Sequence, residues 1–380
     1  MANRCHHPER SGVSILEVLF AILITSIGLM GAIAIFPAAM LQAKRGMQAD
    51  AAAVSGLGNI HAFDTQGMRQ PALWLQFISG RYNVVAVPDG SRAYCLDPRF
   101  VAANQNDPNA NNFPYGPTNS VVQRVTLDSG IPVATNAAPR IMDVLQSELN
   151  FRIEDDLAYD RFRNSLNVVD DTLHAASLFV REAPATLNGP PGLPLKRQSQ
   201  GHFSWMATLA PKLERLPTAA QVGTQVLPTF EDRYVLSVVI FHDRPVQLQA
   251  SGTYDQSEWA LNVNMAAPYG AGIGGGDMRL IENTTSLSAE ERFRRIHIQR
   301  DQWIMLLSHT DITINNQQRV SPLCRWYRVV DADERDAANN SIDVTLSGAD
   351  WENTNQTTYA VVCQGVVAVF EKTIKLEPRS

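Results

Sequence analysis

The feature that most constrains this chain is a long run without charge near its N-terminus. No Asp, Glu, Lys or Arg occurs from Val18 to Ala43, although charged residues make up 18% of the whole sequence. At 1.5 Å per residue, the roughly 24 residues from Val18 to Leu41 would form about 36 Å of helix, more than the ~30 Å hydrocarbon core of a bilayer. The run therefore predicts one transmembrane helix.

A cleaved secretory signal is the main alternative for this run. Such a signal has an apolar core of about 7–15 residues followed by a small-residue cleavage site. The run is about twice that length and offers only the weak candidate site Phe36-Pro37-Ala38-Ala39. The basic residues Arg4 and Arg10 favour a cytoplasmic N-terminus and an exported C-terminal part, although Lys44 and Arg45 on the far side weaken this asymmetry.

One acidic residue, Glu17, stands at the start of the apolar segment. A carboxylate in lipid costs a few kcal/mol, so Glu17 either marks the interfacial end of the span or has a functional partner. The stretch Gly12-Val13-Ser14-Ile15-Leu16-Glu17 resembles the class III signal of type IV pilins and type II secretion pseudopilins. In that signal a glycine precedes the cleavage point and a glutamate is the fifth residue of the mature chain. The apolar run that follows is similar to the PilV and GspI minor subgroup.

The resemblance implies how the N-terminus is processed and what it contacts. A prepilin peptidase would cut after Gly12 and methylate the new amine of Val13, where the family usually has phenylalanine. Glu17 would pair with the amine of a neighbouring subunit during filament assembly. The implied partners are the peptidase, other pilin or pseudopilin subunits, the inner-membrane assembly platform and the lipid bilayer. The implied location is the inner membrane, with a C-terminal head in the periplasm or in a surface filament.

The helical pattern continues beyond the span as a stalk. Met40, Met47 and Val54 recur at intervals of seven residues, and several alanines favour helix. Pro37 lacks an amide donor and is expected to kink the helix, slightly displaced from the position usual in the family. We expect the helix to end between residues 56 and 64. The predicted organisation is a leader (1–12), a transmembrane and stalk helix (13–64) and an exported head (65–380).

The predicted fold class of the chain is α+β: a long N-terminal helix is followed by a large head with a mixed, mainly antiparallel β-sheet. The run Arg233–Phe241 reads as a central strand buried on both faces. Short helices are expected near 140–149 and 288–295, and a subdomain boundary near 188–194. Further strands are expected at 82–87, 121–127, 202–209, 278–281, 302–308, 325–330, 342–346 and 361–370.

No catalytic, cofactor or metal site is predicted. The sequence has no H-E-x-x-H, G-x-S-x-G or C-x-x-C motif, and the glycine-rich stretch 269–276 lacks the lysine of a phosphate-binding loop. The acidic stretch 331–336 lacks the spacing of an EF-hand, so a solvated turn is favoured over a calcium site. With 32 basic and 38 acidic residues the chain has a net charge of −6, and no nucleic-acid partner is predicted.

The cysteines are too few for a disulfide-stapled scaffold. Cys5 lies in the leader, and Cys95, Cys324 and Cys363 remain. An oxidising compartment allows one disulfide among them, and Cys324 with Cys363 is the expected pair because both lie near C-terminal strands.

Two functions from different classes fit the sequence. The first is a non-enzymatic minor pilin or pseudopilin, cleaved after Gly12 and assembled into a type IV pilus or a type II secretion pseudopilus. The second is a single-pass membrane-anchored periplasmic or surface binding protein that does not polymerise. Processing at Gly12 and sensitivity of assembly to Glu17 distinguish them.

Overall fold

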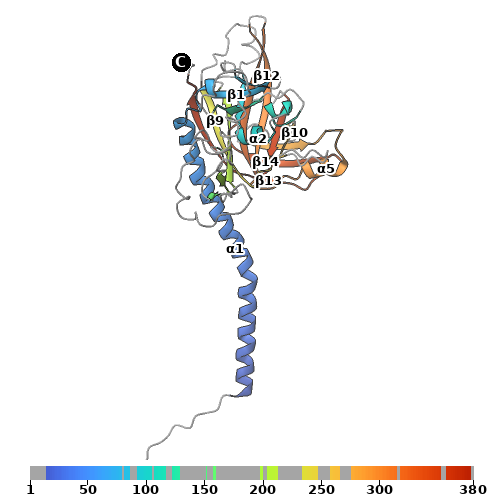
Figure 1. Ribbon diagram of the computed structural model, residues 1–380. Helices are drawn as coiled ribbons and strands as arrows, with labels where there is room; N and C mark the ends of the chain where they lie inside the picture. The colour runs from blue at the N-terminus through green and yellow to red at the C-terminus, as the bar shows by residue number, and fades with distance from the viewer. Residues whose placement is uncertain are drawn as a thin grey trace, which may run out of the picture. The chain divides into compact units, whose positions relative to one another are not determined.

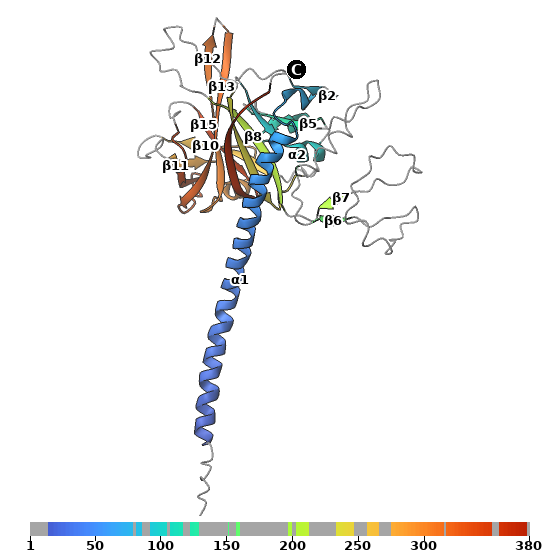
Figure 2. The ribbon, with the colours of Figure 1, turned by 90° about the vertical axis from the view of Figure 1, so that its left-hand side faces the viewer.

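The computed structural model describes residues 14–78, 81–85, 92–104, 107–116, 122–128, 151, 157–159, 197–199, 203–212, 233–246, 257–265, 275–314, 317–351 and 357–377. The chain divides into two compact units, residues 1–51 and 52–380. Figure 1 shows the ribbon, and Figure 2 shows it turned by 90°.

The first unit is dominated by helix α1 (Ile15–Thr65), which continues into the second unit. The large apolar side chains that the structure describes between Ile15 and Met40 are exposed, as expected for a segment that lipid would cover. Among the described residues, α1 is the one helix that is long and apolar enough to cross a membrane. The structure thus agrees with a membrane-spanning helix here, and the helix ends one residue after the predicted stalk.

Within the second unit, the last turns of α1 lie on the sheet through small residues. Ala52, Ser55 and Gly56 are buried, and a Cβ atom on Gly56 would lie 2.2 Å from ring carbons of Phe370. The absence of a side chain at Gly56 therefore lets the helix backbone approach the sheet closely. Phe63, further along the same face, is fully buried.

Ion pairs hold the end of α1 in place. Asp64 accepts a hydrogen bond from Lys372 Nζ at 2.9 Å and pairs with Arg69 Nε at 2.6 Å. The backbone N–H of Glu377 donates to the carbonyl of Arg69, so the C-terminal segment is tied to the turn that follows the helix.

The second unit contains an eight-stranded sheet. Its strands run in the order β16-β9-β8-β3-β5-β1-β2, and β4 pairs with β5. The neighbours are antiparallel except β3 and β5, which are parallel. The strands are β1 (Trp74–Ile78), β2 (Arg81–Val84), β3 (Ala93–Leu96), β4 (Asn112–Phe113), β5 (Val122–Leu127), β8 (Phe203–Pro211), β9 (Arg233–His242) and β16 (Val366–Lys375).

Both faces of the sheet are covered, which explains its continuous apolar strands. Along β9, Leu236, Val238 and Ile240 join the core that contains Phe63 of α1. The alternate residues Val239 and Phe241 join a second core with residues of other strands. The prediction that β9 is a central strand buried on both faces is confirmed.

The second core lies between the sheet and a closed six-stranded barrel, in which the strands follow the order β10-β11-β14-β13-β12-β15. All pairs in the barrel are antiparallel. The strands are β10 (Glu258–Asn264), β11 (Gly275–Ile281), β12 (Trp303–Ile314), β13 (Gln317–Ala332), β14 (Ser341–Ser347) and β15 (Thr358–Cys363). Figures 1 and 2 both show these strands grouped beside the sheet.

The barrel is inserted between β9 and β16, which pair with each other. Its incoming and outgoing connections meet, because Gln364 N–H donates to the carbonyl of Ser257 at 2.8 Å. Next to them, His242 N–H donates to the carbonyl of Gly365 at 2.7 Å. Gly365 has a φ of +80°, and a Cβ there would lie 2.4 Å from the His242 carbonyl oxygen, so the crossing requires glycine.

The remaining elements are short. Helix α5 begins with a capping box, in which the Ser288 hydroxyl accepts from Glu291 N–H and the Glu291 carboxylate accepts from Ser288 N–H. These elements are η1 (Pro71–Leu73), α2 (Pro98–Ala103), η2 (Pro108–Asn111), α5 (Ala289–Arg295) and the strand pair β6 (Leu157–Tyr159) and β7 (Arg197–Ser199).

The predicted elements are largely present, with one clear error. The strand expected at 361–370 is two strands, β15 and β16, because Gln364 and Gly365 form a turn that carries the chain from the barrel to the sheet. Strands β12 and β13 extend well beyond their predicted bounds. The helix expected at 140–149 and the boundary expected at 188–194 lie outside the described residues.

Candidate functional site

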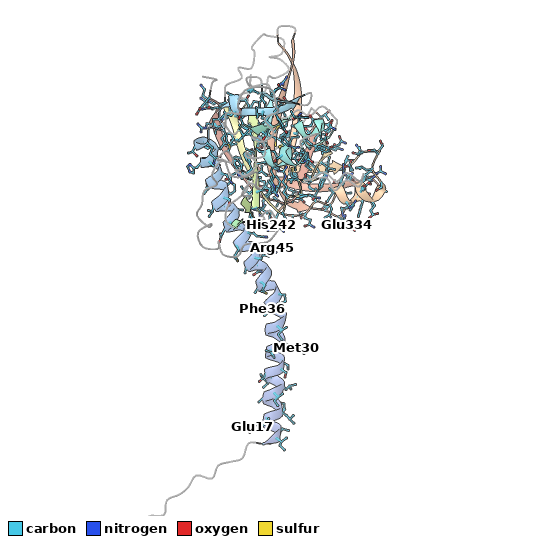
Figure 3. The ribbon with its side chains drawn as sticks, in the orientation of Figure 1. Glu17, Met30, Phe36, Arg45, His242 and Glu334 are labelled. Atoms are coloured by element: carbon cyan, nitrogen blue, oxygen red, sulfur yellow. The ribbon has the colours of Figure 1, made fainter. Side chains whose placement is uncertain are left out.

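Glu17 lies in the first turn of α1, at its N-terminal end (Figure 3). Ser14 precedes the helix, and its carbonyl accepts from Glu17 N–H at 2.9 Å while its hydroxyl accepts from Leu16 N–H at 3.3 Å. Ser14 thus satisfies amide groups that a helix start leaves without partners. Gly12 and Val13, the predicted cleavage and methylation positions, lie outside the described residues.

The helix surface beside Glu17 forms a shallow groove. It is lined by Glu17, Val18, Ala21, Ile22, Thr25 and Ser26. The side chains of Ala21 and Ser26 are small, and the Thr25 hydroxyl donates to the Ala21 carbonyl at 2.7 Å, so it is satisfied within the helix. Small or internally satisfied residues of this kind allow another helix to approach closely in lipid. Glu17 is the one charged group in this groove.

Pro37, the predicted kink, lies inside α1, which is assigned as one helix on both sides of it. Proline has no N–H, so the carbonyl of Ile33 lacks the usual helical donor at this point. The kink itself stays a prediction.

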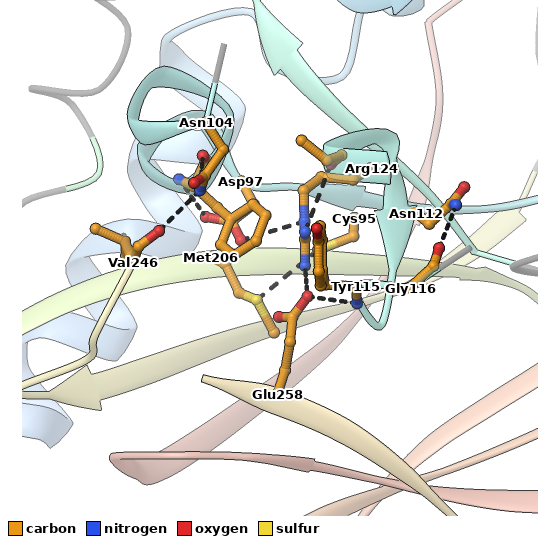
Figure 4. A network of polar contacts seen from close by, with 12 residues as sticks. Cys95, Asp97, Asn104, Asn112, Tyr115, Gly116, Arg124, Met206, Val246 and Glu258 are labelled. Atoms are coloured by element: carbon orange, nitrogen blue, oxygen red, sulfur yellow. Dashed lines mark hydrogen bonds and ion pairs between the residues drawn. The ribbon is translucent and has the colours of Figure 1, made fainter. Parts of the chain in front are cut away.

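The head contains a buried group of four ionic side chains, called here the ionic quartet: Asp97, Arg124, Arg244 and Glu258. Figure 4 labels three of them, Asp97, Arg124 and Glu258. Each of these four residues is at most 4% exposed. Arg244 forms a double hydrogen bond with Asp97, at 2.9 and 2.6 Å, and Arg124 Nε lies 3.4 Å from Asp97 Oδ2. Arg124 Nη2 also donates to Glu258 Oε1, and Arg244 lies 3.5 Å from Glu258 Oε2.

The quartet joins the sheet to the barrel. Asp97 is the N-cap of α2, and its side chain accepts from Phe100 N–H. Arg124 lies on β5, Arg244 follows β9, and Glu258 is the first residue of barrel strand β10. The folded chain thus brings two carboxylates and two guanidinium groups from separate elements together where β10 begins.

Aromatic and main-chain groups complete the surroundings of the quartet. The Arg124 guanidinium lies 3.9 Å from the centre of the Phe100 ring, and the Arg244 guanidinium lies 4.3 Å from that of Phe241. Tyr115 N–H donates to Glu258 Oε1 at 2.7 Å. Burial alone would raise the pKa of Asp97, but Arg244 and Arg124 hold it below its ordinary value. The four side chains are paired with one another, which suits a structural junction rather than proton transfer.

The remaining cysteines are free and buried, so the predicted Cys324–Cys363 disulfide is wrong. Cys324 is opposite Leu307 on β12, whereas Leu307 is opposite Tyr359, four residues before Cys363 on β15. Two strand spacings and four residues separate the thiols by well over the ~7 Å that a disulfide allows. Burial raises the pKa of all three thiols, which keeps them protonated and unreactive.

The other sequence candidates have ordinary structural roles. The Asp336 carboxylate accepts from Ala338 and Asn339 N–H, so it shapes the turn before β14. Two further ion pairs lie nearby: Arg295 pairs with Glu282, and Arg328 pairs with Asp301. Among the described residues, no group of three or more His, Cys, Asp or Glu side chains could hold a metal ion.

Sequence reasoning missed the ionic quartet. The available signal was the presence of charge inside or beside apolar strands, as with Arg124 in VVQRVTL and Glu258 before WAL. Their mutual pairing depends on contacts between residues more than 100 positions apart, which no local pattern encodes. Comparison with family models, with curated proteins and with solved structures gave no match for this chain.

Proposed function

We propose that this protein is a minor pilin-like or pseudopilin-like subunit, cleaved after Gly12 and assembled through α1 into a type IV pilus or type II secretion pseudopilus. It acts by packing and presentation rather than by catalysis. The carrying observation is the combination of Gly12, Glu17 and a long exposed apolar helix that precedes a large β-rich head in the chain.

The energetics of Glu17 support assembly as the role of the helix. No ion pair of Glu17 occurs within the described part of the chain, and the next 26 positions supply no charge. A carboxylate at the edge of lipid costs a few kcal/mol unless a cation comes close. The amine of Val13 on a neighbouring subunit would supply that cation after cleavage, so insertion into a filament would lower the free energy of both groups.

The head supports presentation as its role. Its sheet is covered on one face by α1 and on the other by the barrel, and the large apolar residues of both cores are buried. Such a head is rigid because its packed layers leave little freedom for shifts between them. The ionic quartet adds a directional contact between the sheet and the barrel.

The test is N-terminal processing in cells that contain a prepilin peptidase. We expect the purified protein to begin at a methylated Val13, and Gly12→Leu to remain uncut. Glu17→Ala should be cleaved and inserted normally but recovered with filaments at a strongly reduced level. Gln42→Ala, at an exposed polar position of the same helix outside the groove, is the matched control and should assemble normally.

Two outcomes would contradict the proposal. An N-terminus that is not cut after Gly12 would exclude the class III signal. Normal cleavage with wild-type filament recovery of Glu17→Ala would leave Glu17 without the assembly role.

A further inference from the structure

Two basic residues, Lys44 and Arg45, directly follow the uncharged run of α1. Helix α1 continues through both positions, and both side chains are exposed. Among the described residues of the first unit, the other charged side chains are Glu17 and Asp50. No ion pair of Lys44 or Arg45 occurs within the described part of the chain, so these residues leave two positive charges without a counter-charge there.

Asp50 is badly placed to supply that counter-charge. It follows Lys44 by six residues and Arg45 by five, which puts it about 120° and 140° away from them around the helix. Opposite charges meet on a helix surface when they are three or four positions apart. Lys44 and Arg45 themselves are about 100° apart, so both cations face the surroundings of the helix.

The position of this basic pair along the helix matches the thickness of a bilayer. The rise from Glu17 to Lys44 is about 40 Å at 1.5 Å per residue. A bilayer measures about 30 Å across its hydrocarbon and about 40–45 Å with its headgroup layers. Helix side chains lean toward the N-terminus, which is here the membrane side, and long basic side chains extend their charges to the interface. With Glu17 at one face, the two cations therefore lie in the headgroup layer of the other face.

Membrane topology does not explain the basic pair. Basic residues beside a span are favoured on the cytoplasmic side, and the orientation predicted from the leader puts Lys44 and Arg45 on the exported side. Lipid chemistry explains them better, because phosphate is the anion that phospholipids concentrate at this depth. A guanidinium binds phosphate through two parallel hydrogen bonds, and an ammonium binds it as a point charge.

We propose that Lys44 and Arg45 bind the headgroup phosphates of anionic phospholipids in the exported leaflet. Lipids with a net negative charge attract basic residues at the membrane surface more strongly than zwitterionic lipids do. A lipid is favoured over an acidic neighbouring protein, because headgroups surround this level of α1 in a single subunit before any assembly. The inference goes beyond the proposed function, since it requires that α1 spans a membrane but requires neither cleavage nor assembly.

The experiment measures which lipids the full-length protein retains. The protein is placed in nanodiscs that contain equal amounts of phosphatidylglycerol and phosphatidylcholine, and native mass spectrometry counts the lipids that stay bound when it leaves the disc. One basic residue near an anionic surface strengthens binding about fivefold. We therefore expect the wild type to prefer phosphatidylglycerol by at least about fivefold, and Lys44→Gln/Arg45→Gln to retain the two lipids within about twofold of each other.

Two matched variants separate the position of the charges from their number. Lys212→Gln/Arg300→Gln removes the same charge from exposed positions of the head and should keep the wild-type preference. Adding Ala49→Lys and Ala53→Lys to the Lys44→Gln/Arg45→Gln variant moves the charges outward by about 8–12 Å and should not restore the preference. All samples carry the same N-terminal form, because the basic residues of a retained leader would also bind lipid.

Four results would overturn the proposal. They are a wild type without lipid preference, a preference that survives Lys44→Gln/Arg45→Gln, an equal loss in the head control, and recovery of the preference when the charges are moved outward. Excess inorganic phosphate should leave the bound lipid in place, and its displacement would assign the basic pair to free phosphate instead. N-terminal processing does not enter this assay, so its failure leaves the proposed function standing, and an uncut Gly12 refutes the proposed function alone.

Discussion

Replacing Glu258 by Gln tests whether the ionic quartet holds the head together. The substitution keeps the shape of the side chain and removes its charge. Glu258 is 1% exposed and accepts from Arg124 and Tyr115. Without its charge, the two buried guanidinium groups of Arg124 and Arg244 would share Asp97 alone. Removing one partner of a buried ionic group leaves an uncompensated charge and costs about 3–5 kcal/mol.

The assay is urea unfolding of the full-length protein in detergent, followed by the fluorescence of tryptophans such as Trp205 and Trp326, which are buried in the two cores of the sheet. With a slope of about 3 kcal/mol per molar urea, the expected loss moves the midpoint down by about 1–1.7 M. The matched control is Asp301→Asn, because the Arg328–Asp301 pair is exposed, with side chains 55% and 64% accessible. Its loss should cost less than about 1 kcal/mol.

Combining Glu258→Gln with Arg244→Met balances the charges again, since Arg124 and Asp97 remain as a pair. We expect the double variant to lose clearly less stability than the sum of the two single variants. A cost of Glu258→Gln no larger than that of the Asp301→Asn control, or strict additivity in the double variant, would refute the reasoning that the quartet acts as a set of paired buried charges.

Two further predictions concern the junction between α1 and the sheet. Gly56→Leu should detach the end of α1 from β16, because even a Cβ at this position would lie 2.2 Å from the Phe370 ring. Limited proteolysis should then cut the stalk faster than in the wild type. Gly58→Leu, at an exposed position, is the control, and equal cleavage of the two variants would contradict the prediction. Burial alone would raise the pKa of Asp64, but Lys372 and Arg69 lower it, so the stabilisation from this carboxylate is present above its ordinary pKa of 3.8 and is lost as the pH falls through the lower folded value. Urea unfolding should therefore show the wild type to be more stable than Lys372→Met by up to about 1 kcal/mol at pH 6. The difference in stability should vanish near pH 2. A difference that stays unchanged across this pH range would contradict the assigned ion pair between Lys372 and Asp64.

The sequence predicted those parts of the fold whose cause is local. The uncharged run defines α1, and Ser288 with Glu291 defines the start of α5 through a capping box. Successive residues of a strand point to opposite faces of the sheet. The continuous apolar run of β9 therefore indicates that both faces are buried.

The closed barrel could not be predicted in this way. Its closure depends on β10 pairing with both β11 and β15, and β15 is about 100 residues away in the chain. The strand alternation of a barrel is also found in open sheets, so the pattern does not distinguish them. The turn at Gln364 and Gly365 was missed because the apolar residues on both sides read as one strand.

The residues of the candidate sites also differ in whether the local sequence could reveal them. Glu17 is identified by contrast with its immediate neighbours, which a sequence displays directly. The ionic quartet depends on which side chains lie close together in space, and the order of residues along the chain does not display this.

The chain enters and leaves the barrel at the same place, so the barrel is an insertion that could be removed from the head as one segment. Ser257 and Gln364 are joined by a main-chain hydrogen bond, and β9 and β16 pair without any contribution from the barrel. A short hairpin turn in place of residues 257–364 would therefore leave the sheet with its strand order unchanged. The excision would also remove Glu258, which would leave two buried arginines, Arg124 and Arg244, with Asp97 as their shared carboxylate partner. A smaller head of this design would therefore need an apolar residue in place of one of these arginines.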